Sequence, residues 1–179
     1  MRGDGEVREV VTGAATGVVA TLAMSAALAR AARRGLLTEP PPRAIVRTAL
    51  PGLSEEAVDV GAIVAHLGYG SAAGVVHRAL LGGPGPAASV LYALGLYAGS
   101  YEGWVPLLGA LPPAHLDDRA RQASMIAGHV VYGAVLGVLA ARRRRAARAA
   151  IRAAWDARMR QESRREQADA ARSAVADAP

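Results

Sequence analysis

Four long stretches of the chain carry no charged side chain. They are residues 10–29, 60–77, 84–101 and 122–141. An α-helix rises about 1.5 Å per residue, so stretches of this length approach or reach the roughly 30 Å thickness of a bilayer's hydrocarbon core. Only short polar segments separate them, which leaves little chain for a soluble core. The pattern predicts an all-α polytopic membrane protein with transmembrane helices at about 10–30, 60–80, 86–108 and 122–141.

Two other readings of the apolar stretches stay open. The first stretch follows Arg2 and ends in small residues at 27–29, so it also resembles a secretory signal. It is longer than a typical signal core, however, and three acidic residues precede it. A buried, alanine-rich helical bundle is the second alternative.

One sequence motif occurs in both the second and the fourth stretch. It reads H-x-x-Y-G-x-x-x-G-V and recurs at an offset of 63 residues. The first copy contains His66, Tyr69, Gly70 and Gly74, and the second contains His129, Tyr132, Gly133 and Gly137. A proline-marked segment precedes each copy. We infer a helical hairpin used twice, with the first two helices corresponding to the last two.

Glycines also recur at helical spacing in the other two stretches. Gly13 and Gly17 begin a stripe of small residues in the first, and Gly95, Gly99 and Gly103 form one in the third. Small residues let membrane helices approach closely, where packing and polar contacts drive association. The stripes therefore predict helix contacts within the chain or between copies of it in a homo-oligomer, although an alanine-rich chain also produces such spacings by chance.

Three ionisable residues fall at one predicted depth in the membrane. His66 and His129 occupy equivalent places in the repeat, and Glu102 lies near the same end of the oppositely directed third helix. Such residues inside spans are functional candidates. They form an ion or proton site, a metal or haem site, or only interhelical hydrogen bonds in which Tyr69 and Tyr132 are the partners.

No sequence feature supports an enzyme. The chain lacks cysteine, a phosphate-cradling glycine loop and a zinc-protease motif, and no nucleophile is paired with a base. We therefore predict no catalytic residue, no metal site and no cofactor. The leading expectation is a structural or interaction membrane protein; an ion or proton conduit is the alternative, and a metal- or haem-binding protein is a further one.

The positive charge of the chain is concentrated after the last apolar stretch. The net charge is +6, and residues 142–179 contain 11 arginines against 5 acidic residues. This segment predicts a cytoplasmic arginine- and alanine-rich helix, drawn to anionic lipid headgroups or simply solvated. Nucleic acid is a weaker partner, because Trp155 is the only ring in this segment on which a base could stack.

Arginines near the span ends also predict an orientation. With four spans, ten arginines fall on the side of the N-terminus and seven on the other. The positive-inside rule then places both termini in the cytoplasm.

The order of these features resembles the small bacterial inner-membrane proteins of the YagU-like family. The resemblance rests on the small-residue first span, the segment Pro41-Pro42-Arg43, and the two H-x-x-Y-G motifs, and covers about residues 8–141. It implies a multi-pass protein of the bacterial plasma membrane and no particular reaction.

Overall fold

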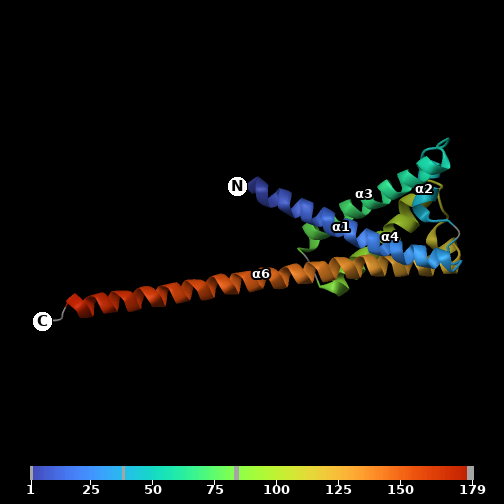
Figure 1. The fold of residues 1–179 in the computed structure, drawn as a ribbon. Helices are drawn as coiled ribbons and strands as arrows, with labels where there is room; N and C mark the ends of the chain where they lie inside the picture. Colours follow the sequence, from blue (N-terminus) through green and yellow to red (C-terminus); the bar gives the residue numbers. More distant parts are fainter. Residues whose placement is uncertain (1, 38, 83–84, 177–179) are drawn as a thin grey trace. The chain divides into compact units, whose positions relative to one another are not determined.

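The computed structural model describes residues 2–37, 39–82 and 85–176, where every regular element is a helix (Figure 1). The chain forms two units, Met1–Ala141 and Arg142–Pro179. The α-helices are α1 (Arg2–Arg33), α2 (Pro41–Ala49), α3 (Glu55–Leu81), α4 (Pro86–Gly99), α5 (Val105–Leu107) and α6 (Arg119–Ala176); η1 (Ser100–Trp104) is a π-helix and η2 (Ala114–Leu116) a 3-10 helix.

Three of the described helices, α1, α3 and α6, are long and apolar enough to cross a membrane. They contain the predicted spans 10–30, 60–80 and 122–141. The predicted span 86–108 is not one regular helix, because the π-helix η1 separates α4 from α5 and Gly103 has non-helical angles (φ −107°, ψ −109°). Pro106 explains the break: a proline ring clashes with the carbonyl four residues earlier and supplies no N–H.

Local sequence signals fix the ends of the long helices. The Ser54 hydroxyl accepts a hydrogen bond from the Ala57 N–H (3.3 Å) at the start of α3, and Gly82 ends that helix in the left-handed conformation (φ 57°). Before α6, the Asp118 carboxylate accepts from the N–H groups of Ala120 (2.9 Å) and Arg121 (3.1 Å). These caps satisfy N–H groups that have no partner within the helix.

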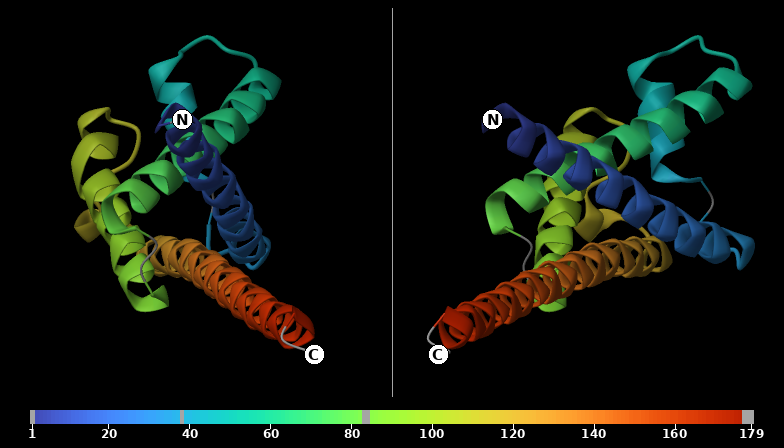
Figure 2. Two further views of the ribbon diagram at one scale, coloured as in Figure 1. Left: turned by 90° about the vertical axis from the view of Figure 1, so that its left-hand side faces the viewer. Right: turned by 60° about the vertical axis from the view of Figure 1, so that its left-hand side comes forward.

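Helices α1 and α3 cross at four glycines, a crossing visible in both views of Figure 2. A Cβ added to Gly13 would lie 2.7 Å from the Val75 Cα, and one added to Gly74 would lie 2.6 Å from the Gly17 Cα. A Cβ added to Gly70 would overlap the Thr21 side chain, which already occupies the space beside it. At Gly13 and Gly74 the nearest atoms belong to the backbone of the other helix, so no side chain fits there.

Helix α6 packs against α4 through the second copy of the motif. A Cβ on Gly133 would lie 2.6 Å from the Val90 Cα, and one on Gly137 would lie 2.5 Å from the Pro86 Cα. Both contacts are with backbone atoms, so they exclude any side chain. The motif glycines of α3 thus contact α1, and those of α6 contact α4.

The core of the first unit lies where α1, α3, α4 and α6 meet. It consists mainly of small and flexible side chains. The buried members are Ala20, Met24, Ala73, Ala93, Tyr132 and Leu136. The three alanines among them let the helices approach closely, as the glycines do.

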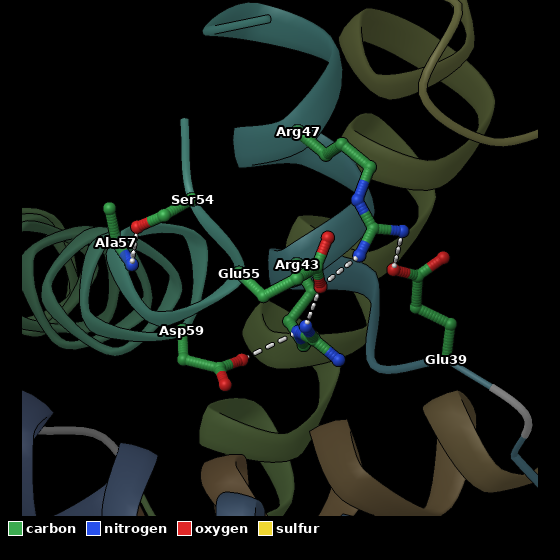
Figure 3. A network of polar contacts seen from close by, with 7 residues as sticks. All are labelled: Glu39, Arg43, Arg47, Ser54, Glu55, Ala57 and Asp59. Atoms are coloured by element: carbon green, nitrogen blue, oxygen red, sulfur yellow. Dashed lines mark hydrogen bonds and ion pairs between the residues drawn. The ribbon is translucent and has the colours of Figure 1, made fainter. Parts of the chain in front are cut away.

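The short helix α2 was not predicted; its first residues had been interpreted as a proline-marked loop. Pro41 and Pro42 instead start the helix, where their missing N–H groups are not needed. An ion-pair network joins α2 to the start of α3 (Figure 3). Arg43 contacts Glu55 (2.7 Å) and Asp59 (2.6 Å), and Arg47 contacts Glu55 (2.9 Å) and Glu39 (2.7 Å).

Replacing Arg43 by Gln is expected to lower the free energy of unfolding by about 0.5–1 kcal/mol, because its two ion pairs are partly exposed to solvent. Molar salt should remove most of this difference by screening. Unfolding titrations at low and high salt measure both effects. Arg34→Gln is the control, since Arg34 is exposed and forms no ion pair among the described residues. A loss that persists at high salt would contradict the electrostatic explanation.

The second unit, Arg142–Pro179, is helical as far as Ala176. Ile151, Trp155 and Met159 follow one another at four-residue spacing and are all exposed. Arg158 and Glu162 form an ion pair one helical turn apart (3.1 Å). The described side chains of this unit therefore build no core of their own.

Candidate functional site

A cavity of about 310 Å³ lies within the first unit, lined by residues of α1, α2, α3, α4, η1, α5 and α6. Most of its lining is apolar, including Met24, Leu28, Ile45, Leu96 and Met125. Five aromatic side chains also line it: Tyr69, Tyr97, Tyr101, Trp104 and Tyr132. Its volume falls at the lower end of the range for pockets that bind small molecules.

The two repeat histidines, His66 of α3 and His129 of α6, line this one cavity. Nδ1 of His129 donates to the Met125 carbonyl (2.8 Å), and Nδ1 of His66 is hydrogen-bonded to the Ser25 hydroxyl (3.3 Å). The hydrogen bonds of the described residues leave Nε2 of both rings without a protein partner. The ring of Tyr97 lies against that of His129, with centroids 5.3 Å apart.

The motif tyrosines are not the partners of these histidines. The Tyr132 hydroxyl donates to the Gly70 carbonyl (2.7 Å) and so joins the two copies of the motif across the cavity wall. The Tyr69 hydroxyl is hydrogen-bonded to the Ser100 hydroxyl (2.9 Å), and its ring lies near that of Trp104. Each tyrosine therefore connects helices rather than orienting an imidazole.

Glu102 is not among the residues that line the cavity, contrary to the predicted three-residue cluster. Its side chain is 41% exposed and contacts His115: one oxygen lies 2.7 Å from Nδ1, and the other accepts from the His115 N–H (2.9 Å). Glu102 lies in η1, next to the non-helical Gly103, so its side chain does not take the direction expected for a regular α-helix. A regular helix had been assumed through this residue.

A second buried polar contact, between α3 and α4, was missed by the sequence analysis. Nε2 of His77 is hydrogen-bonded to the Ser89 hydroxyl (3.0 Å), and both residues are buried. The Tyr92 ring lies edge-on to His77, and its hydroxyl donates to the Ala73 carbonyl (2.7 Å). The only available signal was a histidine near the end of an apolar stretch, which does not identify its partner.

Among the described residues, the predicted glycine stripe of the third span makes no close helix contact. A Cβ added to Gly95, Gly99 or Gly103 would meet no atom within 4 Å. Gly103 also leaves the stripe, because its backbone is not helical.

We also searched for a possible metal site. Over the part of the chain that the structure describes, no three His, Cys, Asp or Glu side chains are grouped so that they could hold a metal ion. The site consists of two imidazoles in an aromatic and aliphatic cavity. Comparisons with protein-family models, curated proteins and solved structures give no match to this chain.

Proposed function

We propose that the chain is a four-span protein of the bacterial plasma membrane, with a structural or interaction role and no catalytic one. The apolar outer surface of its helices supports the membrane assignment. In the apolar windows of α1, α3 and α6, only 28%, 28% and 39% of the residues are buried. Large apolar side chains such as Leu22, Ile63, Leu80 and Leu91 are exposed. In water such a surface would be an aggregation hazard, whereas lipid solvates it.

The fourth span would consist of α4, η1 and α5 together. These elements follow one another without a gap from Pro86 to Leu107. At about 1.5 Å per residue, a segment of this length reaches across the hydrocarbon core. Its π-helix is compatible with a membrane where neighbouring protein covers the backbone, and Tyr101 and Val105 are indeed buried.

Duplication of a hairpin is supported by the equivalent roles of the motif glycines. Gly70 and Gly74 contact α1, and Gly133 and Gly137 contact α4. The two histidines of the motif also reach the same cavity. A shared ancestry of α1–α3 and α4–α6 accounts for both observations.

Other sequence predictions remain untested. They are the resemblance to YagU-like proteins, self-association through Gly95, Gly99 and Gly103, and attraction of the arginine-rich tail to anionic lipid. Ion or proton passage also stays a prediction; of its three proposed groups, His66 and His129 line the cavity, and Glu102 contacts His115.

Single cysteines test the proposed membrane topology. Thr48→Cys in α2 and Ser163→Cys in the tail place one thiol each at exposed positions of a chain that has no cysteine. In intact cells, we expect an impermeant maleimide to label position 48 and not position 163. After the membrane is permeabilised, both should react.

Labelling of position 163 in intact cells would overturn the cytoplasmic assignment of the C-terminus. Recovery of the unmodified protein in the soluble fraction after carbonate extraction would overturn the membrane assignment itself. The cysteine-free protein is the control for labelling of other molecules.

A further inference from the structure

We propose that the cavity binds a hydrophobic molecule carrying an aromatic hydroxyl group, which enters from the lipid and donates a hydrogen bond to His129. This inference goes beyond a structural role in the membrane. It depends on three features of the site: its entrance, its lining, and the hydrogen-bonding state of the His129 ring.

The entrance of the cavity lies between α3 and η1. Of the residues that line the cavity, only Ala65, Tyr69 and Trp104 are exposed, and they come from these two elements. The large side chains beside them on the outer surface, Val64 and Leu107, are apolar and exposed. In the proposed membrane orientation, this entrance opens on the lipid at the level of the headgroup layer, so the molecule that reaches it must partition into a bilayer.

The lining selects for an aromatic ring. Tyr69, Tyr97 and Trp104 line the cavity together with aliphatic side chains such as Leu28 and Leu96. Aromatic rings gain from offset or edge-to-face contact with one another beyond the burial of their area. A lipid acyl chain would fit the aliphatic part but would not make these contacts.

His129 supplies the polar contact. Its Nδ1 donates to the Met125 carbonyl, so the neutral ring has its proton on Nδ1 and a lone pair on Nε2. No described residue donates to that Nε2. A ligand that satisfies it must be a donor, and a hydroxyl is the simplest donor on an uncharged, lipid-soluble molecule. His66, in the same cavity, is a second polar group within the site.

Fluorescence quenching of Trp104 tests the proposal directly. The chain has two tryptophans, and Trp155→Phe in the tail leaves Trp104, in the cavity wall, as the only one. The protein with this background change is placed in lipid nanodiscs and titrated with 4-bromophenol or with 4-bromoanisole. The ether has the same ring and bromine but cannot donate a hydrogen bond.

We expect saturable quenching by both compounds, with the phenol binding about tenfold more tightly, the effect of one hydrogen bond. His129→Leu should remove this preference, because it should weaken the binding of the phenol and not that of the ether. His115→Leu, which changes an exposed histidine outside the cavity, should leave it intact. Ala65→Leu narrows the entrance at an exposed position and should weaken the binding of both compounds. This variant tests the site even if His129→Leu fails to fold.

Other outcomes overturn the proposal. Equal affinity for phenol and ether in the unchanged cavity would indicate an acyl-chain site without hydroxyl recognition. Quenching that never saturates, and that Ala65→Leu does not alter, would indicate partitioning into lipid alone. A haem absorption band in the purified protein would assign the two histidines to a cofactor. None of these results changes the membrane topology, which the cysteine labelling tests separately.

Discussion

Gly74→Ala is expected to lower the free energy of unfolding by about 2–3 kcal/mol, the upper part of the range for overpacking a close contact. The added Cβ would lie 2.6 Å from the Gly17 Cα and 2.8 Å from the Gly17 N, both backbone atoms of α1. A side chain could rotate away from such a clash, but a backbone cannot. The helices must therefore separate, and the contacts of Gly13 and Gly70 at the same crossing weaken with them.

Gly95→Ala is the matched control for this prediction. It makes the same chemical change in a helix, at a position where a Cβ meets nothing within 4 Å. Since alanine is the better helix former, the control should be neutral or slightly stabilising. Unfolding by sodium dodecyl sulfate, followed by tryptophan fluorescence, measures both proteins. Equal stabilities would show that α1 and α3 do not cross at these glycines.

Leu136→Ala has the second largest expected effect, about 2 kcal/mol of destabilisation. Leu136 is 1% exposed and belongs to the core formed by α1, α3, α4 and α6. In soluble proteins a Leu→Ala change in a core costs about 2–5 kcal/mol, of which one part is transfer from water and another is the cavity left behind. Moving a leucine side chain from lipid into a protein core changes its free energy little, because both surroundings are apolar. The cost of the cavity therefore dominates.

Leu91→Ala distinguishes the two contributions. Leu91 is 70% exposed, on the outer surface of α4. Surrounded by lipid, its truncation should change stability by less than about 0.5 kcal/mol. The same unfolding assay applies to both variants. A loss at Leu91 as large as that at Leu136 would mean that Leu91 is buried by another molecule, such as a second copy of the chain.

The long helices were predictable because burying a charged side chain in a membrane is costly, so membrane-spanning stretches carry almost no charge. The predicted spans 10–30, 60–80 and 122–141 lie within α1, α3 and α6. Their boundaries differ because polar helical residues, such as those preceding residue 10, extend a helix without entering the apolar stretch. Absence of charge marks the lipid-compatible part of a helix and not its full length.

The features that were missed depend on single residues or on contacts distant in the sequence. Predicting the break between α4 and α5 would have required giving Pro106 more weight than the apolar composition around it. Predicting α2 would have required interpreting Pro41 and Pro42 as the start of a helix. The partners of Arg43 could not be found from sequence, because Glu55 and Asp59 lie on the next helix.

The candidate site was only partly predictable for the same reason. The repeat indicated that His66 and His129 are equivalent, and both line one cavity. Their hydrogen-bond partners, Ser25 and the Met125 carbonyl, carry no motif. Glu102 was assigned by its depth along a straight helix, and depth does not determine the direction of a side chain in a π-helix.

The π-helix at Ser100–Trp104 also bears on the position of the protein in the proposed membrane. Backbone carbonyls displaced from regular α-helical pairing are tolerated in hydrocarbon only under cover of neighbouring protein, or else near water. Glu102 and His115 are exposed in this region, so its outer side must reach the aqueous boundary. Tyr69 and Trp104, both exposed, suit the headgroup layer at the same level. In the proposed orientation, Pro106, which breaks the helix, therefore limits how deeply this end of the first unit can lie in hydrocarbon.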